Sequence, residues 1–164
     1  MARYSATWTG ITAAAVNDTT TFTAGQAPGF LRSGASTQML RINEVYIGGE
    51  DTSSVATQMI LARTSTISVG ALSVGNNALL DFNSTAPGTT AAWGSTAATT
   101  FPQRSSTLYL LDLSLNTFGG ISRWQARYGE EITCFGNTAT GGEVCLSSKA
   151  GTGKTSGHLI YEVC

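Results

Sequence analysis

The chain has 164 residues and a formal net charge of −1, and only 12% of its residues are charged. This length suits one domain with a hydrophobic core and a mostly neutral, polar surface. The balanced charge offers no broad attraction to nucleic acid or to an anionic membrane, and no apolar run is long enough to span a bilayer, so we expect neither partner. The first residues lack the apolar stretch of a secretion signal, which favours folding in a cytoplasm.

Residues 1–37 are expected to form an extended arm or a first strand, followed by a loop. Tyr4, Ala6 and Trp8 alternate along one side of the first segment, as they would in a strand. Glycine and proline interrupt residues 19–34, which is typical of a loop.

The strongest strand pattern in the first half of the chain covers residues 38–47. Its large apolar side chains change sides midway, with Leu40 and Ile42 on one side and Val45 and Ile47 on the other. This change predicts a β-bulge or a bend near Asn43 and Glu44. Residues 55–66 fit either a helix or a strand, and their β-branched residues favour a strand.

Residues 83–106 are rich in Thr, Ala, Ser and Gly, and they predict a long loop. Loops longer than about fifteen residues in a compact domain are usually functional or disordered. Trp93 and Phe101 are its only large apolar residues, and each either pins the loop to its own domain or contacts a partner. Together with Tyr4 and Trp8 of the first segment, they are our candidate protein-interface residues.

Apolar alternation also predicts strands in the second half of the chain. They are expected over residues 107–115, 121–127, 132–135, 143–147 and 158–163. In the first of these, Tyr109, Leu111, Leu113 and Leu115 share the side that should face the core. A glycine-rich loop joins the last two, either as a hairpin or as two strands in different layers of a sandwich.

About eight strands with glycine-marked turns and no convincing helix predict an all-β fold. We expect residues 38–164 to form a single-domain antiparallel β-sandwich that is jelly-roll-like. The strand segments recur without a fixed sequence repeat, which argues against a propeller or a solenoid.

The glycine-rich loop contains a run, Gly151 to Thr155, that is similar to the end of a phosphate-binding loop. The full motif needs a glycine at the position of Ser148, and a following helix whose N-terminus holds the phosphates. A short strand is expected here instead. We therefore predict a solvated turn and no nucleotide cofactor.

No catalytic or metal-binding pattern stands out in the sequence. His158 is the only histidine, and no serine lies in a nucleophile-elbow motif. Glu130 and Glu131 are adjacent, so on a strand they would point to opposite faces, unlike the facing carboxylates of a glycosidase. The three cysteines are predicted to be free thiols: Cys134, Cys145 and Cys164. We expect no enzymatic activity, no metal and no cofactor.

Several segments resemble one known class of protein. The segments are Glu44–Glu50 (EVYIGGE), Asn116–Trp124 (NTFGGISRW), Gly129–Ile132 (GEEI) and Gly157–Glu162 (GHLIYE). In this order they resemble the capsid decoration, or cement, proteins of tailed bacteriophages, of the single jelly-roll type. The resemblance implies a homotrimer bound to the major capsid protein shell on the virion exterior, without catalytic residues. Removing the first nine residues, or Trp93→Ala, would then weaken shell binding more than it lowers stability.

A carbohydrate-binding jelly roll is the alternative function. Such modules stack sugars on exposed aromatic side chains near polar groups, and the candidates are Trp8, Trp93, Trp124 and Tyr128. Exposed aromatic rings gathered on one face would favour this reading, whereas an oligomer with loops in its subunit contacts would favour the capsid reading.

Overall fold

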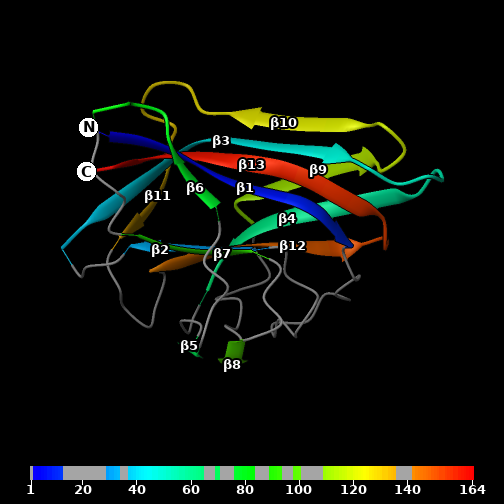
Figure 1. Ribbon diagram of the computed structural model, residues 1–164, viewed down its shortest axis with the longest axis horizontal. Coiled ribbons are helices and arrows are strands. Elements are labelled where there is room, and N and C mark those ends of the chain that lie inside the picture. The colour runs from blue at the N-terminus through cyan, green and yellow to red at the C-terminus, as the bar shows by residue number, and fades with distance from the viewer. Residues whose placement is uncertain are drawn as a thin grey trace.

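The computed structural model is a β-sandwich of two antiparallel sheets packed face to face (Figure 1). It describes residues 2–12, 29–33, 37–64, 69–70, 76–83, 89–93, 98–100, 109–135 and 142–164. Every regular secondary-structure element in these ranges is a β-strand. The same ranges contain no helix that is long and apolar enough to cross a membrane.

The strands are β1 (Ala2–Thr12), β2 (Gly29–Ser33), β3 (Met39–Gly49), β4 (Ala56–Arg63), β5 (Val69–Gly70), β6 (Asn76–Leu79), β7 (Thr89–Trp93), β8 (Ala98–Thr100), β9 (Leu111–Asn116), β10 (Ile121–Gln125), β11 (Ile132–Phe135), β12 (Glu143–Ala150) and β13 (Lys154–Val163).

The path of the chain through the two sheets is that of a jelly roll. The first sheet has the order β10-β3-β13-β1-β6, with β11 also paired to β3, and the second has the order β7-β2-β12-β4-β9. Strands β1 to β4 alternate between the sheets, and the last two strands insert between them: β12 between β2 and β4, and β13 between β1 and β3. The predicted antiparallel, jelly-roll-like sandwich is confirmed.

The core lies between the sheets and is built by the alternating apolar residues. Its largest fully buried side chains on the two inner faces are Leu31, Leu40, Ile42, Ile47, Met59, Leu61, Leu146, Leu159 and Tyr161. The rings of Tyr4 and Tyr161 stack with their centroids 5.5 Å apart and so join β1 to β13. Leu115 is buried and Leu111 and Leu113 pack against the core, as predicted for the strand that is now β9.

The second sheet is buried on its outer side as well. Phe30, Ile60 and Cys145 are at most 1% exposed, yet they do not belong to the core cluster between the sheets. In Figure 1 the small β5–β8 ribbon lies on this outer side. The first sheet differs, because its outer face carries partly exposed polar side chains, and this face holds the site described below.

The predicted bulge in β3 is confirmed. The pairing of β13 with β3 shifts between Ile160, which is opposite Glu44, and Tyr161, which is opposite Ile42. Asn43 is therefore the extra residue. Because of it, Ile42 and Val45 both face the core, and Asn43 and Glu44 both lie toward the outer face.

Two expected loops contain strands. Gly29–Ser33, placed in a loop, is β2 at the centre of the second sheet, where it pairs with β12 and β7. The segment is only five residues long, so tertiary pairing outweighs its flanking glycines. The expected loop over residues 83–106 contains β7, which pairs with β2, and β8, which pairs with β5.

The two closing strands belong to different sheets. β12 lies in the second sheet and β13 in the first, so the second of the two predicted alternatives is correct. Gly151 turns the chain between them with φ 84°, which only glycine adopts readily. A strand follows the glycine-rich loop, as predicted, but it begins at Lys154 rather than at residue 158, and Gly153 and Thr155 are buried rather than solvated.

Candidate functional site

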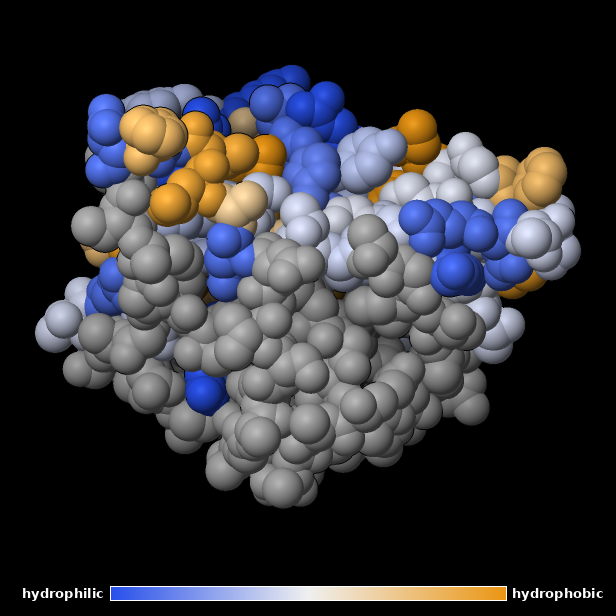
Figure 2. Space-filling view, in the orientation of Figure 1, coloured by the Kyte–Doolittle hydropathy of each residue, from blue (hydrophilic) through white to orange (hydrophobic). Residues whose placement is uncertain are grey.

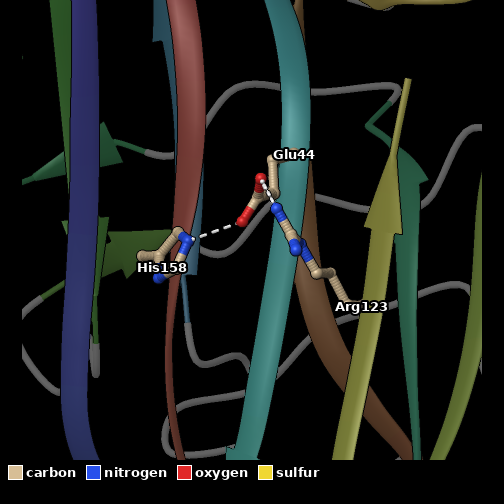
Figure 3. A network of polar contacts seen from close by, with 3 residues as sticks. All are labelled: Glu44, Arg123 and His158. Atoms are coloured by element: carbon tan, nitrogen blue, oxygen red, sulfur yellow. Dashed lines mark hydrogen bonds and ion pairs between the residues drawn. The ribbon is translucent and has the colours of Figure 1, made fainter. Parts of the chain in front are cut away.

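Three charged or titratable side chains meet on the outer face of the first sheet (Figure 3). Glu44 of β3 lies between Arg123 of β10 and His158 of β13. Arg123 donates from Nη2 to Glu44 Oε2 over 2.8 Å, and His158 Nε2 lies 2.9 Å from Glu44 Oε1. The carboxylate thus links three adjacent strands side by side.

The register of the sheet explains why these residues meet. Glu44 and His158 are 114 residues apart in sequence, but β13 runs antiparallel beside β3 with Ile160 opposite Glu44 and His158 opposite Tyr46, so Glu44 and His158 are diagonal neighbours across the two strands. The ring of Tyr46, also on β3, stacks on His158 with centroids 5.1 Å apart and an interplanar angle of 8°. The imidazole of His158 is therefore held by two residues of β3, Glu44 and Tyr46.

The environment of Glu44 favours its charged form. The hydrogen bond from Arg123 is the main cause that lowers the pKa of Glu44 below the usual glutamate value. Burial acts in the opposite direction, because Glu44 is only 8% exposed, and the hydrogen bond with His158 lowers the pKa further. Glu44 is therefore an ionised, internally paired carboxylate at neutral pH.

A groove of about 370 Å³ opens beside this network on the same face. We call it the Tyr128 groove, and its polar lining includes Arg3, Arg41, Asn43, Gln125, Tyr128 and Glu131. β1 and β3 supply residues of its floor, while the end of β10 and the turn before β11 form its wall. A second hollow of about 340 Å³ shares Arg41, Tyr128 and Glu131 with it. Tyr128 thus lines both hollows.

A hollow of a different character lies elsewhere. It measures about 470 Å³, and small and polar uncharged residues of β4 and β9, such as Ala56, Gln58 and Ser114, line it. It contains no titratable side chain. The Tyr128 groove combines a charged lining with an exposed aromatic ring, so we regard it as the better candidate for chemical recognition.

The four predicted interface residues do not form one exposed surface. Tyr4 and Trp8 are each 3% exposed and belong to the core, because β1 lies between β13 and β6 rather than extending away as an arm. Their rings serve the packing of this domain, which corrects their prediction as surface contacts. Trp93 ends β7, and Phe101 lies outside the described residues.

The other candidates for sugar stacking also separate into two kinds. Trp124 is partly buried and packs against the core from β10. Tyr128 is 101% exposed in the turn after β10. Of the candidate aromatic side chains that the structure describes, Tyr128 is thus the one that is available to a ligand.

The cysteines are free, as predicted. Cys134 and Cys145 are buried in β11 and β12, whereas Cys164 is exposed at the end of the chain. Burial raises the pKa of the Cys134 thiol to about 12. Within the described ranges, no three His, Cys, Asp or Glu side chains come together as metal ligands would.

Sequence reasoning missed the Glu44 network and most of the Tyr128 groove. Their residues come from strands at both ends of the chain, and no local motif connects them. Tyr128 alone carried a usable signal, as an aromatic residue beside the glycine of a turn. Comparisons of the chain with protein-family models, with curated proteins and with solved structures found no match.

Proposed function

We propose that this protein is a viral structural protein that forms a ring of identical copies, most simply a trimer, and decorates the outer face of a capsid shell. Two features support the proposal beside the sequence resemblance to phage decoration proteins. One is the jelly-roll-like sandwich. The other, which carries it, is a pair of exposed apolar patches on the first sheet (Figure 2).

The first patch lies at one end of the sheet and is called the β6 patch. It consists of Leu79, Leu80 and Phe82, which are 42%, 52% and 96% exposed. In the described part of the chain β6 pairs only with β1, so its other edge offers unpaired backbone groups as well. Three large apolar side chains next to a sheet edge are typical of a protein-contact surface.

The second patch, called the turn patch, lies at the opposite end of the molecule in Figure 1, where β9 turns into β10. It consists of Phe118 and Ile121, which are 62% and 64% exposed. Its position is fixed: Phe118 N donates to Asn116 Oδ1 over 2.9 Å, and Gly120 N donates to Asn116 O over 2.8 Å. The turn therefore presents its apolar side chains in one defined arrangement.

Two different patches at opposite ends suit a cyclic assembly. A ring needs a heterologous interface, in which one surface of each copy contacts a different surface of the next. The β6 patch of one copy against the turn patch of its neighbour meets this need and covers both apolar surfaces. The low charge of the chain is consistent with such contacts, because interface cores are depleted in charged residues.

The test is a measurement of mass in solution, followed by co-sedimentation with empty capsid shells of tailed bacteriophages that lack their own decoration protein. We expect three chains per particle and sedimentation with at least one kind of shell. Phe82→Ser should reduce both the number of chains per particle and the sedimentation with shells. Phe101→Ser tests the sequence-based prediction that Phe101 is an interface residue. A protein that stays monomeric at all concentrations and sediments with no shell would overturn the proposal.

A further inference from the structure

The turn that carries Tyr128 has an ordered backbone. Glu130 N donates to Arg127 O over 2.9 Å, and Gly129 has φ 85°, as in a type II β-turn with Tyr128 at its second position. Gly129 N also donates to Glu131 Oε1 over 3.1 Å. An exposed aromatic ring on an ordered turn loses little further conformational freedom when a ligand covers it.

The base of the turn is fixed to the sheet. Ala126 N donates to Asn43 O over 2.8 Å, which ties the end of β10 to the bulge in β3. The same bulge places the side chain of Asn43 in the Tyr128 groove. Its Nδ2 atom is buried and has no hydrogen-bond partner among the protein atoms described.

The charges of the groove largely balance one another. Arg3 pairs with Glu162 at 3.1 Å. The backbone N–H groups of Glu131 and Gly129 are the main causes that lower the pKa of Glu131, and the positive charge of Arg41 contributes in the same direction. The groove thus offers closely set donors and acceptors without a large net charge.

This chemistry distinguishes among ligand classes. A nucleic acid or another polyanion would need unpaired cations, and a lipid chain would need an apolar channel. Paired carboxylates, guanidinium groups and amides instead match neighbouring hydroxyl groups, each of which both donates and accepts a hydrogen bond. An aromatic ring beside them supplies a flat apolar surface for the C–H face of a sugar ring.

The shape adds a requirement for length. The two hollows of about 370 and 340 Å³ share Arg41, Tyr128 and Glu131, so they adjoin, and one long ligand can occupy both. We propose that the Tyr128 groove binds an uncharged oligosaccharide of several sugar units, with Tyr128 stacking on one sugar and Asn43 and Arg41 bonding to its hydroxyl groups. This goes beyond the structural function proposed above and does not depend on it.

The experiment titrates the full-length protein with neutral hexasaccharides, namely maltohexaose, cellohexaose, mannohexaose and N-acetylchitohexaose, by calorimetry and by saturation-transfer NMR. We expect at least one to bind. Tyr128→Ala should weaken that binding about tenfold or more, whereas Tyr128→Phe, which keeps the ring, should largely preserve it. Lys154→Ala removes an exposed side chain outside the groove and outside both apolar patches, and it should leave sugar binding unchanged.

Two results would overturn the proposal. One is the absence of binding to all four sugars at millimolar concentration. The other is equal binding by the wild type and Tyr128→Ala. A hyaluronan hexasaccharide forms a further arm, and its binding in preference to every neutral sugar would contradict the uncharged class. The mass of the particle in solution is measured for each variant, so a failure of the sugar site is distinguishable from a failure of ring assembly.

Discussion

Glu44 shows how one residue can connect three strands on an otherwise polar face. Its carboxylate accepts a hydrogen bond from Arg123 on one side and contacts His158 on the other. Arg123 has a side chain that is 52% exposed, so solvent screens part of this interaction. The network therefore contributes a modest stabilisation, and it orients the polar face more than it strengthens the fold.

We expect Glu44→Gln to lower the free energy of unfolding by about 1 kcal/mol at neutral pH. The pKa of Glu44 is lowered in the folded protein, so its contribution is complete above the ordinary glutamate value of 4.5. The contribution is lost as the pH falls through the lower folded-state value, because the native state must then take up the proton. Urea unfolding of the wild type and the variant across this pH range measures the difference.

The matched control is Glu130→Gln, which changes an exposed glutamate in the turn after β10. It should alter stability by less than about 0.5 kcal/mol. If the stability difference between the wild type and Glu44→Gln stays constant down to about pH 3, the carboxylate is not the source of the effect.

The sequence pattern predicted which residues share one side of a strand better than it predicted what that side contacts. The alternation of Tyr4, Ala6 and Trp8 correctly placed the three on one side of a strand, but it could not show whether that side met the core or a partner. Neighbouring strands decide this, and here β13 comes from the other end of the chain. The same limit hid the contact between Glu44 and His158.

At the scale of elements, three turns converge on Thr117. Thr117 is buried; its N and Oγ1 atoms both donate to Val55 O, at 2.9 and 3.0 Å, and its carbonyl accepts from Asp51 N at 2.8 Å. Gly153, in the connection from β12 to β13, lies so close that an added Cβ would overlap the Thr117 side chain. These contacts fix the β3–β4, β9–β10 and β12–β13 connections to one another.

Gly153→Ala should therefore destabilise the protein by about 1–3 kcal/mol, because the new methyl group forces Thr117 or the turn to move. Lys154→Ala, one residue further along, removes an exposed side chain and should change stability by less than about 0.5 kcal/mol. Thermal unfolding of both variants makes the comparison. Equal stability of the two variants would show that the turn relaxes freely around the new methyl group. Separately, if the wild type bound ATP and Lys154→Ala did not, the phosphate-loop motif would have been rejected wrongly.

The position of β1 in the first sheet changes the expected effect of removing the N-terminal residues. The sequence led us to expect that removing the first nine residues would affect shell binding more than stability. β1 instead pairs with β13 and β6 and buries Tyr4 and Trp8 in the core. Truncating one buried aromatic side chain costs about 3–5 kcal/mol, and whole domains are stable by about 5–15 kcal/mol.

We therefore expect the truncated protein not to fold, as judged by loss of its β-sheet circular dichroism and of a cooperative thermal transition. A finer test compares two adjacent residues of β1. Tyr4→Ala should lower stability strongly, whereas Arg3→Ala, whose side chain is 56% exposed, should change it little. A truncated chain that melts like the full-length protein would contradict the central place of β1.

The strands themselves were predictable to the extent that they alternate over many residues. β3, β4, β9, β10 and β13 follow such patterns, and even the bulge at Asn43 was visible as a change of apolar side. Gly29–Ser33 was not, because it is short and bounded by turn residues. Apart from Trp93, the strands inside residues 83–106 consist of small residues, which carry little hydrophobic pattern.

At the scale of the molecule, the two outer faces differ. The second sheet buries Phe30 and Ile60 on its outer side, while the first sheet leaves polar side chains and two apolar patches exposed. The polar groove around Tyr128 and the apolar patches are separate sets of residues. Variants can therefore address the proposed sugar site and the proposed subunit contacts separately.

The proposed head-to-tail contact makes a prediction that isologous assemblies do not share. A β6-patch variant, Leu80→Ser with Phe82→Ser, keeps an intact turn patch. A turn-patch variant, Phe118→Ser with Ile121→Ser, keeps an intact β6 patch. These side chains are exposed, so both variants should fold and be monomeric.

Mixing the two variants in equal amounts restores one intact interface, between the turn patch of the first and the β6 patch of the second. Each chain has then used its only working patch, so growth stops at a pair. We expect a particle of twice the 17.0 kDa chain mass, containing one copy of each variant, in native mass spectrometry. In an isologous dimer each patch would contact its own copy, and the mixture would form no mixed pair; that outcome would exclude the head-to-tail ring.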